Sequence, residues 1–183
     1  MTSVPPSIFH LTNQEIFVVT AAHAGQISGQ VATWVMLASL VPEQLRVVVA
    51  ISPFNFTNEL IQASGRFALN LLAADQTAWM VRFGLYSSRE INKFEGISYQ
   101  LSPGGLPLLP NTCGWAECRI GQQLLTGDRY LYIADVLHHQ VDPERQPLRE
   151  QEAFSQLTAD ERTALDEKLQ RDIDHSRSLI QPF

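Results

Sequence analysis

Hydrophobic residues in the first part of the chain gather into short runs that turn-forming residues separate. The runs Ile16–Ala22, Gln30–Ser39, Leu45–Ile51 and Phe67–Leu72 are rich in β-branched and other apolar residues, which predicts four strands. Both alternating sets of positions are apolar in Gln30–Ser39, as expected for a strand that is buried on two faces. Residues 23–29 contain two glycines and form the predicted turn between the first two strands.

Two helical patterns interrupt these strands. Thr57 precedes the run NELIQAS and Gly65 follows it, so we predict a short helix with a hydroxyl N-cap and a glycine at its end. A second helix is expected to begin at Asp75 and to end at Gly84, with apolar residues at helical spacing. Residues 85–110 are rich in Ser, Gly and Pro and predict a loop with short strands, a candidate rim or lid.

Two further strands are expected at Trp115–Ile120 and Tyr130–His138, as an antiparallel pair around the segment GQQLLTGD. This gives six or seven strands in a meander with two short inserted helices. The order favours a mainly β (α+β) barrel over a parallel sheet built from βαβ units.

The C-terminal part of the chain differs from the rest. Asp142–Glu152 is polar, and Thr158–Glu161 then forms a capping box before a long helical pattern. Apolar residues recur on one face of that helix at Leu165, Leu169 and Ile173. We therefore divide the chain into a barrel domain over residues 1–140 and, over residues 141–183, a linker and an amphipathic helix that packs on the barrel or on a dimer partner.

Composition narrows the classes of function. The net charge of −6, with only 13 lysines and arginines, leaves no basic stripe for nucleic acid. No segment is apolar over the length of a bilayer, and the start MTSVPPSIFH lacks the pattern of a signal peptide. We expect a cytoplasmic protein that is not attached to a membrane. We predict no metal site, because neighbouring strand residues such as His138 and His139 point to opposite faces.

Candidate chemistry lies where the third strand runs into the first helix. The sequence contains no nucleophile elbow, zinc helix, phosphate loop or dinucleotide turn. At Asn55, Phe56 and Thr57, however, a helix N-terminus offers free N–H groups and partial positive charge, which suit a phosphate. An ordinary N-cap explains the same residues equally well. Glu59 in the first turn favours the N-cap unless its carboxylate points away.

The order of several sequence blocks resembles the flavin reductase-like, FMN-binding split-barrel family over roughly Ile16–Gln140. The blocks are IFVVTAA, SGQVATWVMLASLVP, VVVAISPFNFTNELIQASGRFALNLLAADQ, RFG, KFEG, LPLLP, WAEC and GDRYLYIADV. The Thr33–Trp34 pair is similar to the flavin-reductase module of flavodiiron proteins. The resemblance implies a Greek-key split barrel with short inserted helices and a C-terminal helix, which binds FMN, or FAD, at the boundary of a homodimer.

The resemblance also implies site residues by position. The residues expected to line the isoalloxazine ring are Ala32, Thr33, Trp34, Val35, Ala50, Ile51 and Ser52. The residues expected to hold the ribityl phosphate are Asn55, Phe56 and Thr57. Arg82 would add positive charge or simply end a helix in solvent, and Lys93 would reach the phosphate or a nicotinamide nucleotide. No side chain is assigned as a catalytic acid or base, because the flavin carries the redox chemistry.

One departure from the family bears on the electron donor. Many members have histidine after the Gly-Asp of the last hairpin, whereas this chain has Arg129 after Gly127 and Asp128. The leading hypothesis is a flavin reductase-like oxidoreductase that passes hydride from NADH or NADPH to the flavin N5. Two alternatives stay open: a non-catalytic FMN electron carrier or flavin-binding protein, and a flavin oxidase-like enzyme that acts on another small molecule.

Overall fold

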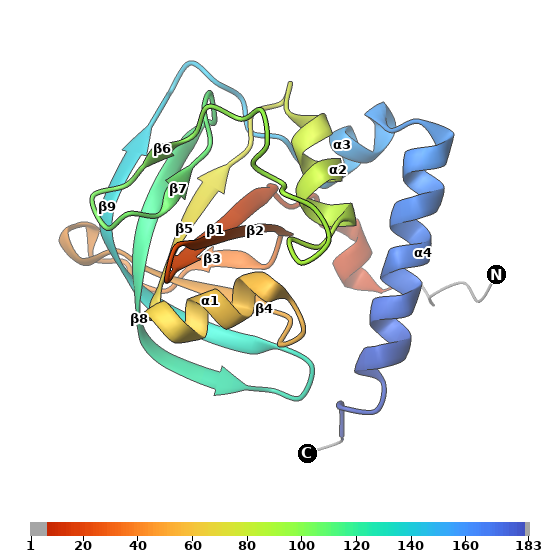
Figure 1. The fold of residues 1–183 in the computed structure, drawn as a ribbon, viewed down its shortest axis with the longest axis horizontal. Coiled ribbons are helices and arrows are strands. Elements are labelled where there is room, and N and C mark those ends of the chain that lie inside the picture. The colour runs from red at the N-terminus through yellow and green to blue at the C-terminus, as the bar shows by residue number, and fades with distance from the viewer. Residues whose placement is uncertain (1–6, 182–183) are drawn as a thin grey trace.

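A computed structural model describes residues 7–181, so part of the N-terminal stretch used above lies outside the described residues. Within this range the chain forms a seven-stranded antiparallel sheet in the order β2-β1-β5-β8-β9-β4-β3, curled into a half-barrel (Figure 1). The large sheet contains β1 (Phe17–His23), β2 (Gln26–Ala32), β3 (Val35–Leu37), β4 (Arg46–Ile51), β5 (Arg66–Leu71), β8 (Gly114–Leu125) and β9 (Tyr130–Val141). A separate pair contains β6 (Gln100–Leu101) and β7 (Pro107–Leu108). The helices are α1 (Phe56–Ser64), α2 (Thr77–Leu85), α3 (Glu150–Gln156) and α4 (Ala159–Ser176), with 3-10 turns at Ile8–Leu11 and Pro42–Gln44. The predicted mainly β barrel with inserted helices and a C-terminal helix is confirmed.

The first hairpin is tighter than the sequence indicates. Ala24 and Gly25 both have positive φ, 48° and 79°, and join β1 directly to β2. Such a two-residue turn matches the right-handed twist of the paired strands. The prediction that residues 23–29 form the turn is therefore wrong, because most of that segment already belongs to β2.

The predicted single strand Gln30–Ser39 is also wrong. β2 ends at Ala32, and the chain then crosses to the opposite edge of the sheet, where β3 pairs with β4. Met36 and Leu37 in β3 are 64% and 63% exposed, so the apolar run reflects an uncovered edge strand rather than burial on two faces. The crossing leaves Thr33 and Trp34 between two strands.

A hydrophobic core fills the concave side of the sheet. α1 packs there against β1 and β2, with Leu60 and Ile61 of the helix in the same cluster as Val19 and Phe67 of the strands. A second apolar cluster lies between the sheet and α2 and includes Phe83. Burial of these side chains fixes the position of the start of α1 relative to the strands.

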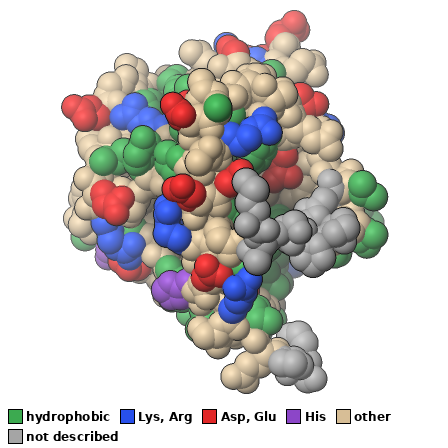
Figure 2. Space-filling view, turned by 90° about the vertical axis from the view of Figure 1, so that its right-hand side faces the viewer, with side chains coloured by type: hydrophobic (Ala, Val, Ile, Leu, Met, Phe, Trp, Pro, Cys, Tyr) green, Lys and Arg blue, Asp and Glu red, His purple; other side chains and the backbone are tan. Residues whose placement is uncertain are grey.

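The C-terminal segment is packed along one side of the barrel (Figure 1). Leu148 is fully buried, and its N–H donates to the carbonyl of Leu72, so the segment predicted to be a linker lies against the sheet. The capping box at Thr158 is confirmed, and Leu165 of α4 lies against Gly84 of α2. Acidic and basic side chains are intermixed on this side of the molecule (Figure 2). Among the described helices, none has the length and apolar character needed to span a membrane.

Candidate functional site

A chain of hydroxyl groups lies at the start of α1. Thr57 and Ser28 are 2% and 1% exposed, and their oxygens are 2.8 Å apart. Ser28 Oγ donates to Ser88 Oγ at 2.9 Å. Because a serine hydroxyl has one proton, the proton between Thr57 and Ser28 comes from Thr57. The proton of Ser88, at the more exposed end of this chain, is therefore free to donate to a ligand.

Arg89 adds a cation beside the same helix start. Its guanidinium donates to the carbonyl of Phe54 at 3.1 Å and pairs with the carboxylate of Glu59. It also lies over the Phe56 ring, 5.3 Å from the centroid. Arg89 thus neutralises the Glu59 charge that would repel an anion at this helix end.

The backbone at the start of α1 keeps its capacity to bind an anion. The N-cap is Asn55 rather than Thr57, and its side chain makes no capping hydrogen bond, so the predicted hydroxyl cap is wrong. Asn58, three residues after the N-cap, is held in place because Tyr132 Oη donates to its Oδ1 at 2.6 Å. Burial raises the pKa of Tyr132 to about 12, so this phenol stays a donor at neutral pH.

Alternation along the strands divides the predicted ring-lining residues into two sets. Ala32 and Ile51 are 7% and 0% exposed and belong to the core cluster, and Val35 packs against it. Thr33, Ala50 and Ser52 are only partly buried, and Trp34 is 57% exposed. The first set therefore offers chiefly backbone, and the second set offers side chains to a ligand.

The exposed ring of Trp34 lies beside the last hairpin. The Trp34 carbonyl accepts from Ala50 N at 3.1 Å, which fixes the segment against β4. The Arg129 guanidinium lies 5.5 Å from the Trp34 ring centroid and is bonded to the carboxylate of Asp128 at 2.8 Å. Arg129 thus points to the predicted ring site rather than away from it.

Thr33 lies beside a different element. Its side chain lies near the carboxylate of Glu150 at the start of α3. Burial raises the pKa of Glu150, and the neighbouring Thr33 side chain opposes that rise. The neighbours Thr33 and Trp34 therefore connect two parts of the chain, α3 and the last hairpin, to the crossing between β2 and β3.

Arg82 and Lys93 lie elsewhere. Lys93 is 4% exposed, and its ammonium donates to the carbonyls of Gly29 and Phe83 at 2.9 and 3.0 Å. Burial, with a smaller effect of the Lys168 ammonium, lowers its pKa from 10.5 to about 8. Each of these contacts is internal, so the role predicted for Lys93 at a phosphate or nucleotide does not fit this geometry.

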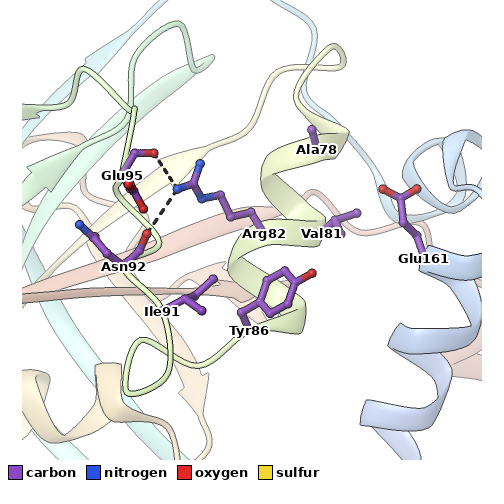
Figure 3. Close-up of a pocket in the computed structure, with 8 residues that line it drawn as sticks. All are labelled: Ala78, Val81, Arg82, Tyr86, Ile91, Asn92, Glu95 and Glu161. Carbon is purple, nitrogen blue, oxygen red and sulfur yellow. Dashed lines mark hydrogen bonds between the residues drawn. The ribbon is translucent and has the colours of Figure 1, made fainter.

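Arg82 borders an open cavity of about 590 Å³ between α2, the loop after it and α4 (Figure 3). Its guanidinium donates to the carbonyls of Asn92 and Glu95 at 3.3 and 2.6 Å, which holds the loop to the helix. Apart from Arg82, no residue of the predicted flavin site lines this cavity. We therefore place the candidate site at α1 and leave Arg82 and Lys93 out of it.

Ser28, Ser88 and Arg89 are the site residues that sequence reasoning missed. Ser28 lies in a segment interpreted as a turn, and the other two lie in a loop 30 residues or more after α1 begins. The adjacent polar pair Ser88-Arg89 in an otherwise unassigned loop is a weak signal, because such pairs are common on surfaces. Only the folded chain brings the three to one helix end.

Comparison with known proteins identifies the family of this chain. A family model described as "Flavin reductase like domain" matches residues 9–157. The high molecular weight rubredoxin of Moorella thermoacetica is 33% identical over 129 residues, which are 69% of this chain and 56% of that protein. A flavin reductase of Pseudomonas putida is 32% identical over 84 residues, 46% of this chain and 48% of that protein. This chain therefore spans about half the length of both relatives.

Among solved structures, a homologue of nitrilotriacetate monooxygenase component B from Mycobacterium thermoresistibile has a TM-score of 0.70. It is 26% identical in sequence, and the match covers 78% of each chain. The matched residues include every strand of the seven-stranded sheet and the whole of α1. The chain belongs to the flavin reductase like domain family.

Proposed function

We propose that the chain binds FMN between Trp34 and the start of α1 and reduces it with NADH or NADPH. The observation that carries this proposal is the polar cluster at α1, where an uncapped helix start, the Ser88 hydroxyl and Arg89 come together. Membership of the flavin reductase like domain family supports it. The names of the relatives describe those proteins, and the same activity in this chain is our proposal.

The residues present fit a flavin phosphate. The backbone N–H groups of Phe56 and Thr57 at the start of α1, the Ser88 hydroxyl and Arg89 are the proposed ligands. A phosphate placed here would compete with Glu59 for Arg89, whose N–H donors form charge-assisted, often bidentate bonds to phosphate. The Glu59 side chain is exposed, so its carboxylate can rotate into solvent when a phosphate binds Arg89.

The ring would lie along the partly buried Thr33, Ala50 and Ser52 and beside the exposed Trp34. When bound, FMN supplies an acceptor for hydride, while the protein supplies orientation and charge. Arg129 and the exposed Trp34 ring border the face from which a second molecule would approach. An arginine there favours an anionic partner such as a nicotinamide nucleotide. The position of Arg129 equally suits the two alternatives, an electron carrier or an enzyme that acts on another anionic small molecule.

A homodimer is part of the proposal. The edge strand β3 and the turn after it expose Met36, Leu37, Leu40 and Val41, with Leu40 fully exposed. An uncovered edge strand with an apolar surface is an aggregation hazard unless a partner covers it. A second copy of the chain, placed on this edge, would also enclose the ring beside Trp34. Sedimentation velocity of the wild-type protein and of Leu37→Lys tests this, and an unchanged monomer in both would contradict it.

Anaerobic mixing with NADH and NADPH tests the proposed activity. The FMN-loaded protein is expected to lose its absorbance near 450 nm, on the order of seconds or faster, with at least one nucleotide. Arg129→Gln is expected to raise the apparent KM for that nucleotide, with FMN affinity unchanged. Retention of full colour with both nucleotides would contradict the reductase and favour the alternatives.

A further inference from the structure

The end of α4 and the residues after it contact both borders of the candidate site. The matched family domain ends at residue 157, and α4 follows it. α4 extends along the barrel toward the region where the loop before α1 and the hairpin β8–β9 come together (Figure 1). We call residues His175–Ile180 the C-terminal strap.

The first contact is aromatic. The His175 ring lies 3.9 Å from the Phe54 ring, centroid to centroid, at an interplanar angle of 35°. Phe54 immediately precedes Asn55, the N-cap of α1, and its carbonyl accepts from Arg89. The strap therefore begins at the entrance to the proposed phosphate site.

The second contact is with the turn of the β8–β9 hairpin. Gly127 has a φ of 96°, and a Cβ at this position would lie 2.6 Å from the Leu179 carbonyl oxygen and 3.2 Å from Ile180. This glycine thus permits both the turn and the close approach of the strap. Arg129, two residues later, lies over Trp34. The strap connects the phosphate end of the proposed site to the hairpin that borders its ring end.

This placement has a consequence for the size of the ligand. A phosphate held by the N–H groups at the start of α1 would lie beside the residues that precede the helix, Phe54 among them. FMN ends at that phosphate, whereas FAD continues into a second phosphate and an adenosine. The continuation would meet the strap.

We propose that the C-terminal strap selects FMN over FAD by closing the space beyond the flavin phosphate. The proposal rests on the proposed function, because it assigns a flavin to this site. His175 acts in it as a specificity-determining residue through its contact with Phe54. Since the strap lies outside the matched family domain, related chains without such a segment are expected to lack this selection.

Equilibrium titration of the flavin-free protein with FMN and with FAD, followed by flavin fluorescence, tests the proposal. The full chain is expected to bind FMN at least about tenfold more tightly than FAD, a difference of ~1.4 kcal/mol. A variant that ends at Asp174 should bring the ratio of the two Kd values below about threefold by tightening FAD, with FMN affinity little changed. This truncation removes none of the described core residues.

Point variants separate the strap from general effects on α4. His175→Ala is expected to lower the ratio of the FAD Kd to the FMN Kd, as the truncation does. Leu169→Ala, at an exposed position of the same helix, should leave this ratio unchanged. Equal FMN and FAD affinity in the full chain, or an unchanged Kd ratio after truncation, would overturn the proposed selection by the strap and leave the proposed function standing. Failure of the full chain to bind either flavin would overturn the proposed function and this proposal together.

Discussion

Replacing Thr57 by valine removes one proton from the hydroxyl chain at α1 and keeps the shape of the side chain. Thr57 Oγ1 lies 2.8 Å from Ser28 Oγ, and both residues are almost fully buried. The variant loses one hydrogen bond and leaves the Ser28 oxygen without its donor, which together cost about 1–2 kcal/mol. For a chain of this size, each kcal/mol lowers Tm by about 2–4 °C. We therefore expect Tm to fall by roughly 2–8 °C.

Thermal unfolding of the flavin-free protein, followed by far-UV circular dichroism, measures this change. Thr163→Val is the matched control, because the Thr163 hydroxyl bonds the Ala159 carbonyl at an exposed position where water replaces it. The control should stay within about 1 °C of the wild type. A Tm for Thr57→Val equally close to the wild type would refute the assignment of Thr57 as the first donor of the chain.

Three other variants test the packing and charges around the site. Gly29→Ala should lower the free energy of unfolding by about 1–3 kcal/mol, because its Cβ would lie 2.8 Å from the Phe83 ring. Gly121→Ala is the control, since its Cβ would lie 3.7 Å from the nearest atom, and it should leave the free energy unchanged when both variants are unfolded in urea. The lowered pKa of Lys93 means that the unfolded chain binds more protons than the folded chain between pH 8 and 10.5. The unfolding free energy of the wild type relative to Lys93→Met should thus rise with pH across that window, by up to about 1.4 kcal/mol per pH unit, and parallel curves would contradict it. Thr158→Ala removes the capping box and should lower the free energy of unfolding in urea by about 1 kcal/mol; an unchanged value would contradict a stabilising role of the cap at the start of α4.

Local patterns in the sequence carry much of the fold. The helix that Gly65 ends and the capping box at Thr158 are found as predicted, because each depends on residues within one or two turns. The prediction of one strand over Gln30–Ser39 is wrong because periodicity shows which residues are apolar but not where the chain crosses between sheet edges. The exposed apolar residues of β3 have the same pattern as a buried strand.

The candidate site was only partly accessible to sequence reasoning. Asn55, Phe56 and Thr57 adjoin a strand and begin a helix, so their neighbourhood follows from chain order. Ser28 and Arg89 reach the same helix end through tertiary packing, which no local pattern encodes. Lys93, in contrast, was predicted in the site and lies outside it. A lysine in a polar loop is usually solvated, whereas this one is buried against two carbonyls. Only the packing of Phe83 and the loop against β2 determines its direction.

Binding of FMN at the start of α1 is the central claim, and titration of FMN into the wild-type protein and Arg89→Gln tests it most directly. The account predicts saturable binding of one FMN per chain to the wild type, with Kd raised about tenfold in Arg89→Gln through loss of one charge-assisted bond. Arg46→Gln, whose guanidinium pairs with Asp135 at the end of β4 that lies away from α1, should bind FMN as the wild type does. Absence of FMN binding in the wild type, or equal affinity in Arg89→Gln, would contradict it.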